Sequence, residues 1–202
     1  MSSVGETVAA IRAGELVVIP TDTVYGLACA PYHEKPVRAL SELKGRVAGQ
    51  PIALVAASLD WLFECVPELR GRAGVVARAL LPGPCTLVFP NPARRYPWLT
   101  GDRPDTIGVR VPDVEGEAAG ILEAVGAVAA TSANRHGAAD PRSLEDVPAE
   151  ILTAVAAALD GGELPGTPST VLDLTGTEPV VLREGAVPTH EALARVAAAL
   201  DK

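Results

Sequence analysis

Short polar side chains stand where an apolar segment near the N-terminus ends. The stretch VVIPTDTVYGLA, residues 17–28, runs from three β-branched residues directly into Thr21, Asp22 and Thr23. A strand that only filled a core would be expected to end in Gly, Asn or Pro turn residues. The hydroxyls therefore suggest a ligand, although Thr21 and Thr23 could equally cap a turn.

Comparable polar residues follow other apolar segments. The tetrapeptide TSAN, residues 131–134, follows AVAA, and Thr106 and Arg110 flank the segment IGV. Ligands of open α/β sheets bind where strands end in loops, so these residues predict one shared pocket for a ligand with several oxygen atoms. The candidate hydroxyl, amide and cationic side chains are Thr21, Thr23, Ser132, Ser169, Thr170, Asn134, Lys44, Arg46, Arg110 and Arg183.

Missing motifs narrow the chemistry of that pocket. The sequence has no GxxxxGK[ST] phosphate loop, no GxGxxG after a strand and no GxSxG elbow for a nucleophilic serine. His33, His136 and His190 lack the spacing of a metal site. The remaining side chains suit the binding and activation of phosphate and carboxylate groups by positioning and charge stabilisation.

Each candidate also has a purely structural interpretation. Lys44 and Arg46 are expected at the C-terminal end of a helix, where the helix dipole favours cations whatever their function. Arg110 could lie at a sheet edge, Ser169 in a turn and Arg183 in solvent. A structural role is plausible for each residue alone and less so for all of them together.

Composition indicates a globular protein of the cytoplasm. Of the 202 residues 48% are apolar, which is enough for a core, and we expect residues 1–202 to form a single domain. No run approaches the ~18 apolar residues of a membrane-spanning helix, and the N-terminus lacks the apolar segment of a signal peptide. Cys29, Cys65 and Cys85 are expected to be reduced packing residues. The net charge of −8 argues against a broadly basic nucleic-acid surface.

The segments that must position these residues alternate between strands and helices. This alternation, with many strands apolar throughout, predicts an α/β fold whose sheet is covered on both faces, and the short late strands favour a mixed sheet. Strands are expected at residues 15–20, 51–57, 85–89, 106–111, 127–131, 169–174 and 179–182. Helices are expected at residues 4–13, 34–43, 58–81 in pieces broken by Pro67 and Gly71, 117–125, 144–159 and 193–200.

Several short motifs occur in a fixed order between about residues 7 and 187. They are PTDTVYGL, KGR followed by QPI, LPGPCTLV, GVRVP, TSAN with Gly137 after it, PSTVLDL and LREGAV. In this order and approximate spacing the sequence resembles the YrdC-like family, the threonylcarbamoyl-AMP synthases of the YciO/YrdC/YwlC group. The resemblance implies a twisted, mixed parallel and antiparallel open sheet with flanking helices and a large central cavity.

The same resemblance implies a nucleotidyltransferase that joins L-threonine, bicarbonate and ATP into threonylcarbamoyl-AMP and pyrophosphate. The threonine amine would take up bicarbonate as a carbamate, whose oxygen attacks the α-phosphorus of ATP. Arginines and Mg²⁺ would make the approach of the two anions tolerable. The product would pass to partner proteins that modify adenosine 37 of tRNA.

The resemblance also implies roles for individual residues. Thr23, Arg110 and Ser169 resemble the threonine contacts of the family. The resemblance assigns no metal ligand. Lys44 and Arg46 would be the catalytic pair, and the ATP and phosphate contacts would be Lys44, Arg46, Gln50, Thr106, Ser132, Asn134 and Arg183.

The sequence departs from the family pattern at two positions. Val47 stands where the family usually has proline after its Lys-x-Arg, a change expected to affect only loop stiffness. Val55 or Ala56 stands where the family commonly has a histidine that contacts threonine. Loss of that hydrogen bond is expected to cost ~1 to 3 kcal/mol of substrate recognition, enough to weaken threonine binding or admit another amine. The additional C-terminal domain of longer members is expected to be absent.

Two other functions remain open at this point. A YciO-like member without this activity would use the cavity to bind RNA, including tRNA or double-stranded RNA, or a nucleotide. The net charge of −8 argues against this RNA-binding function, whereas the missing histidine argues for it. A relative that forms a carbamoyl-adenylate from carbamoyl phosphate would keep the adenylate chemistry but change the acceptor.

Overall fold

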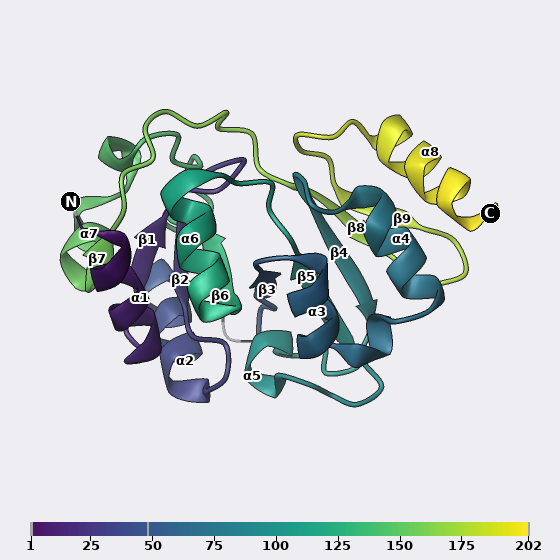
Figure 1. Ribbon diagram of the computed structural model, residues 1–202, viewed down its shortest axis with the longest axis horizontal. Coiled ribbons are helices and arrows are strands. Elements are labelled where there is room, and N and C mark those ends of the chain that lie inside the picture. The colour runs from purple at the N-terminus through teal and green to yellow at the C-terminus, as the bar shows by residue number, and fades with distance from the viewer. Residues whose placement is uncertain (1, 48, 202) are drawn as a thin grey trace.

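The computed structural model describes residues 2–47 and 49–201, and its strands form one nine-stranded sheet (Figure 1). The strand order across the sheet is β7-β1-β2-β6-β3-β5-β4-β8-β9. The parallel pairs β1–β7, β3–β5 and β4–β8 occur among antiparallel pairs, so the predicted mixed sheet is confirmed. The strands are β1 (Val17–Ile19), β2 (Gly26–Cys29), β3 (Ala53–Ala56), β4 (Cys85–Pro90), β5 (Thr106–Arg110), β6 (Ala127–Ser132), β7 (Ala157–Ala158), β8 (Thr170–Asp173) and β9 (Val180–Arg183).

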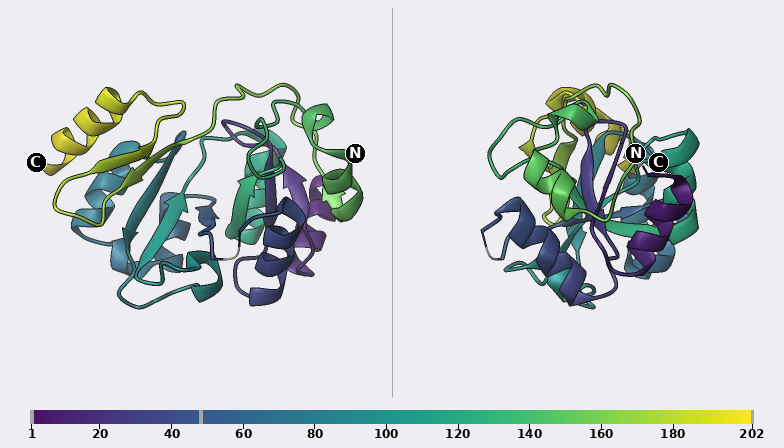
Figure 2. Two further views of the ribbon diagram at one scale, coloured as in Figure 1. Left: turned by 180° about the vertical axis from the view of Figure 1, so that it is seen from behind. Right: turned by 90° about the vertical axis from the view of Figure 1, so that its left-hand side faces the viewer.

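Helices cover both faces of the part of the sheet that contains β1, β2 and β6. Seen end-on, α1 and α6 lie on one side of the strands and α2 lies on the other (Figure 2). The helices are α1 (Val4–Arg12), α2 (Glu34–Lys44), α3 (Leu59–Cys65), α4 (Arg72–Leu80), α5 (Pro97–Thr100), α6 (Gly116–Val125), α7 (Ala149–Ala154) and α8 (Thr189–Leu200), with 3₁₀ turns η1 (Pro67–Leu69) and η2 (Leu144–Asp146).

Burial on both faces explains why the strands read as uninterrupted apolar runs. Side chains alternate between the faces of a strand, and in β1 Val18 joins one core cluster while Val17 and Ile19 join the other. The larger cluster also holds Val37 and Leu40 of α2, as the helical spacing predicts. Strands covered on both faces need apolar residues at every position, and β1 and β2 show this pattern. In β4 and β8 buried positions alternate with half-buried ones, and β9 is mostly exposed, so the predicted cover on both faces holds for only part of the sheet.

The expected helix over residues 144–159 is wrong in its second half. Ser143 and Asp146 form the predicted capping box, but α7 ends at Ala154 and the chain continues as β7. The Ala156 amide donates to Leu16 O at 2.8 Å and the Leu159 amide donates to Val18 O at 2.9 Å. Pairing with β1 therefore overrides the local helix preference of an alanine-rich segment.

The turn after α2 places the cationic KGR motif. Gly45 has φ of 68°, the left-handed conformation that ends many helices, and its amide donates to Glu42 O at 3.0 Å. The Arg46 amide then donates to Ser41 O at 3.0 Å. This cap leaves Lys44 on the helix and directs Arg46 along the following loop.

No helix within the described residues is long and apolar enough to cross a membrane.

The cysteines Cys29, Cys65 and Cys85 are free, and burial raises the pKa of the Cys29 thiol to about 12. The expectation of reduced packing cysteines is confirmed for Cys29 and Cys85, which are buried, whereas Cys65 is only half-buried.

Candidate active site

A cavity of about 630 Å³ lies against the central strands, and segments far apart in sequence line it. Its wall includes the β1–β2 loop, the segment after α2 and parts of β3, β4, β5, β6, β8 and β9. The structure therefore brings together polar residues that follow several different strands. The candidate residues that line it are Thr21, Gln50, Thr106, Arg110, Ser132, Ser169 and Arg183, whereas Arg46 contacts its wall through Thr131.

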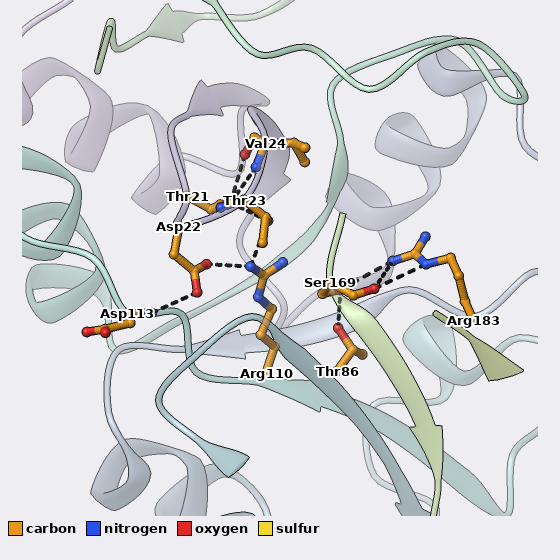
Figure 3. Close-up of polar contacts among 9 residues, drawn as sticks. All are labelled: Thr21, Asp22, Thr23, Val24, Thr86, Arg110, Asp113, Ser169 and Arg183. Atoms are coloured by element: carbon orange, nitrogen blue, oxygen red, sulfur yellow. Dashed lines mark hydrogen bonds and ion pairs between the residues drawn. The ribbon is translucent and has the colours of Figure 1, made fainter. Parts of the chain in front are cut away.

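Arg110 at the end of β5 anchors one end of the site (Figure 3). Its Nη2 donates to Thr23 Oγ1 at 2.8 Å and forms an ion pair with Asp22. Thr23 is fully buried beneath the guanidinium and does not line the cavity. Thr21 does line it, but its hydroxyl also closes the turn by donating to Val24 O at 2.7 Å. The two threonines thus have different tasks, one in the turn and one under Arg110.

Ser169, just before β8, joins the ends of two other strands (Figure 3). Its hydroxyl lies 2.8 Å from the Thr86 hydroxyl on β4. Arg183 at the end of β9 donates from Nη2 to Ser169 O at 2.8 Å and to Ser169 Oγ at 3.2 Å. Burial lowers the pKa of Arg183, and the charge of Arg110 lowers it further. The two guanidinium groups are therefore close enough to interact.

Lys44 is almost fully buried and binds the TSAN turn. Its Nζ donates to Ser132 Oγ and to Asn134 O, both at 3.1 Å, and also contacts Ser132 O and Asn134 Oδ1. Burial, followed by repulsion from Arg46, lowers the pKa of Lys44 to about 8. Lys44 and Asn134 do not line the cavity, so in this structure they act on it through Ser132, which does.

Arg46 and Gln50 carry buried polar atoms that the protein leaves unpaired. Arg46 donates from Nη2 to Pro51 O at 2.7 Å and from Nη1 to Thr131 Oγ1 at 3.3 Å. Among the described residues, Arg46 Nε, Gln50 Oε1 and Arg110 Nε are buried without a hydrogen-bond partner. Burying such groups unpaired is unfavourable, so they indicate a ligand that supplies both acceptors and a donor.

Val55 faces the cavity, whereas Ala56 is fully buried and does not line it. In the parallel pairing of β3 with β5, Val55 is the partner of Arg110. An apolar side chain therefore stands beside the guanidinium. Val47 also lines the cavity while remaining 64% exposed, so it forms part of the rim.

Sequence reasoning assigned no site role to several residues that the structure places here. Asp22 pairs with Arg110, and Thr86 contacts Ser169. A polar residue inside the apolar strand CTLVF was the available signal for Thr86, and the position of Asp22 between two threonines was the signal for Asp22. Thr131 also lines the cavity and belongs to the TSAN tetrapeptide, whereas no sequence signal distinguished the lining residues Asp102 and Arg103.

Comparison with known proteins identifies the family. A family model named for Sua5, YciO and YrdC, with the description "Telomere recombination", matches residues 9–185. The chain belongs to this Sua5/YciO/YrdC family. It is 38% identical over 182 residues to a threonylcarbamoyl-AMP synthase of Pyrococcus abyssi, which covers 90% of this chain and 53% of that protein. It is 37% identical over 184 residues to a putative threonylcarbamoyl-AMP synthase of Mycobacterium tuberculosis, covering 91% of this chain and 84% of the relative.

Solved structures of the Sua5/YciO/YrdC family share this fold. The P. abyssi Sua5 protein complexed with L-threonine matches with a TM-score of 0.86 and 36% identity, over 95% of this chain and 56% of that chain. E. coli YciO matches with a TM-score of 0.79 and 26% identity, over 94% of this chain and 92% of that chain. The resemblance and the fold class predicted from the motifs are confirmed. This chain spans only about half the length of the P. abyssi relative.

Proposed function

We propose that this protein is an L-threonylcarbamoyladenylate synthase, a nucleotidyltransferase that forms threonylcarbamoyl-AMP and pyrophosphate from L-threonine, bicarbonate and ATP. The observation that carries the proposal is the set of unpaired buried atoms at a cavity of about 630 Å³: Gln50 Oε1 and Arg110 Nε belong to residues that line it, and Arg46, whose Nε is also unpaired, contacts the lining residue Thr131. Ligand pockets range from about 300 to 1,000 Å³, so this one has room for a nucleotide with a small second substrate. The names of the P. abyssi and M. tuberculosis relatives support the same activity.

The residues of the cavity divide between two anionic substrates. At one end the free Nε–H of Arg110 suits the carboxylate of an amino acid, with Ser169 beside it. At the other, Arg46 and Ser132 suit the phosphates of ATP. Arg183 donates to Ser169, so we place it where the two substrates meet and assign it to the phosphates. We assign the remaining candidates to the nucleotide end, where Lys44 and Asn134 hold Ser132, and Gln50 and Thr106 complete the wall.

The reaction requires two anions to approach each other. The threonine amine adds to bicarbonate-derived CO₂ and loses a proton, giving a carbamate. A carbamate oxygen then forms a bond to the α-phosphorus of ATP as the bond to the pyrophosphate leaving group breaks. Arginines fixed in a buried site stabilise the charge of both partners and require no reorganisation during the step.

Mg²⁺ fits this site as a companion of ATP rather than as a resident ion. Within residues 2–47 and 49–201, no group of three His, Cys, Asp or Glu side chains could hold a metal. Mg²⁺ usually reaches such sites on the phosphates with few protein ligands, where it neutralises part of their charge. Asp102 is the carboxylate that lines the cavity and could contact such an ion.

Pyrophosphate release from ATP tests the proposal. The assay contains Mg²⁺ and bicarbonate, with L-threonine present, absent or replaced by each other amino acid. Threonine-dependent release and recovery of threonylcarbamoyl-AMP are the expected results. Release with another amine would overturn threonine as the substrate, a sharp question because Val55 lies beside Arg110. Absence of release with every amine would overturn the enzyme activity.

The second candidate is a YciO-like binding protein for RNA or a nucleotide. The likeness to E. coli YciO over 92% of that chain favours it, as does the apolar Val55 in the cavity wall. Binding of tRNA or double-stranded RNA without ATP turnover would support it. For the synthase we further propose a cytoplasmic location and transfer of the product to tRNA-modifying partner proteins.

A further inference from the structure

The arginines at the cavity differ in their counter-ions. Arg103, Arg110 and Arg183 line it and Arg46 contacts its wall, and of these four arginines only Arg110 forms an ion pair with a described residue. Arg46 and Arg183 donate instead to neutral carbonyl and hydroxyl oxygens. The charge of Asp140 acts on Arg183, but Asp140 lies beyond ion-pair distance. The Arg110 end of the cavity thus contains a buried ion pair, whereas Asp102, the carboxylate that lines the cavity, forms no ion pair with Arg46, Arg103 or Arg183.

Asp22 supplies that neutralising charge from behind Arg110. It does not line the substrate cavity but lies in the wall of a second cavity of about 310 Å³. Its Oδ1 pairs with Arg110 Nη2, and its Oδ2 accepts from the Asp113 amide at 3.2 Å. Both side chains of the pair are about nine-tenths buried. The carboxylate therefore fixes one edge of the guanidinium and leaves Nε without a partner (Figure 3).

We propose that Asp22 is a specificity-determining residue that reserves the Arg110 end of the cavity for a single carboxylate and keeps polyphosphate away from it. Without Asp22, Arg110 would stand as a free cation near Arg183, and paired arginines bind phosphate groups well. With Asp22 in place, the pair has no net charge but still offers fixed N–H donors. Such a pair attracts a highly charged polyphosphate weakly and still orients a carboxylate.

The inference deepens the proposed function, because it takes the cavity to hold a polyphosphate and an amino acid together. Its first test involves no turnover. Inorganic pyrophosphate is titrated into the protein by calorimetry, without ATP or amino acid, for the wild type and for Asp22→Asn. Glu117→Gln is the matched control, because this substitution changes the net charge by the same amount as Asp22→Asn. Glu117 lines the same second cavity and has no hydrogen bond or ion pair to Arg110.

The wild type and Glu117→Gln are expected to bind one pyrophosphate with the same affinity within about twofold. Asp22→Asn is expected to bind a second pyrophosphate, or the first about tenfold more tightly, which corresponds to 1.4 kcal/mol. The double variant Asp22→Asn/Arg110→Gln is expected to return to wild-type binding, because the extra site needs the free guanidinium. Unchanged binding in Asp22→Asn, or an equal gain in Glu117→Gln, would overturn the proposal.

The double variant also covers the case in which Asp22→Asn fails to fold. It removes both charges of the buried pair, so it leaves no uncompensated ion. If Arg110 normally takes no part in polyphosphate binding, pyrophosphate affinity stays within about twofold of the wild type; a loss of about tenfold or more would overturn the proposal.

A kinetic test then connects the residue to specificity. In the wild type, pyrophosphate should compete with ATP and not with the amino acid, whereas in Asp22→Asn it should also compete with the amino acid. A merely structural role would lower kcat without changing this inhibition pattern. Failure of the wild type to turn over would count against the proposed function, while the calorimetric result would still decide the role of Asp22.

Discussion

Lys44 and Arg110 are both buried cations beside one cavity, but the protein surrounds them with different partners. Lys44 contacts only neutral oxygens of Ser132 and Asn134, whereas Arg110 contacts the carboxylate of Asp22. The pKa of Lys44 falls to about 8, because burial and the charge of Arg46 disfavour its protonated form. Among the described residues no carboxylate pairs with Lys44 or Arg46 at the end assigned to the triphosphate, whereas Asp22 pairs with Arg110 at the end assigned to the amino acid.

Loss of Arg46 is expected to give the largest effect at the uncompensated end. Arg46→Ala removes a guanidinium whose Nε is buried without a partner, and turnover should fall by roughly 10² to 10³-fold, as when one preorganised donor to a developing charge is lost. Pyrophosphate release and thermal unfolding measure the two consequences. Arg38→Ala, which removes an arginine with an exposed side chain on α2, is the control. A folded Arg46→Ala protein with normal turnover would remove our assignment of the phosphate site.

Substitution of Lys44 should lower activity less than substitution of Arg46, because Lys44 acts on the cavity through Ser132. Lys44→Met keeps the length of the side chain but leaves the buried oxygens of Ser132 and Asn134 without their donor. We expect kcat/KM for ATP to fall by about ten- to a hundredfold, with a much smaller change in KM for the amino acid. Equal losses for both substrates would show that the two ends are not separate.

The lowered pKa of Lys44 predicts opposite effects of pH on activity and on stability. As pH rises through about 8, folded Lys44 loses its proton and its hold on Ser132 weakens, so KM for ATP should rise. The ordinary pKa is 10.5, so between about 8 and 10.5 the unfolded state binds more protons and this residue adds stability as pH rises. Lys44→Met should lack both trends in pH-rate profiles and chemical denaturation. Parallel trends in the wild type would contradict the assignment.

Thr86 gives the smallest expected effect, at the neutralised end. Thr86→Val keeps the shape of the side chain but removes the hydroxyl 2.8 Å from Ser169 Oγ. One such hydrogen bond is worth about 1 kcal/mol, so KM for the amino acid should rise about fivefold while KM for ATP stays constant. Thr153→Val is the control, since its exposed hydroxyl donates to Ala149 O within α7 and Thr153 does not line the cavity. A larger effect on KM for ATP would contradict the assignment of Ser169 to the amino-acid end of the cavity.

Sequence patterns predicted most elements of the fold because their signals are local. Apolar runs marked β1, β3 and β6, and the spacing of Val37 and Leu40 marked α2. The helix prediction was wrong at residues 155–159, because this segment pairs with β1, which lies more than a hundred residues away in the sequence. No local pattern encodes such a pairing. Pairing of this kind can be known only once the topology is known.

The candidate site was predictable as a set of residues but not as a network. Hydroxyl and cationic side chains at strand ends indicated Arg110, Ser132 and Ser169, which all line the cavity. Sequence alone could not show that Thr23 lies beneath Arg110, or that Asp22 neutralises it, because 87 and 88 residues separate these partners along the chain. The choice between Val55 and Ala56 likewise depended on which side of β3 faces the cavity.

The cavity wall draws on residues from Thr21 to Arg183, and this span has a consequence for biosynthesis. A ribosome must complete β9 before the last guanidinium can join the site, and the non-local pairings of the sheet form slowly. The pocket is therefore expected to be complete only when residues through Arg183 have emerged and folded. Ligand binding would then report formation of the whole nine-stranded sheet rather than of any one part of it.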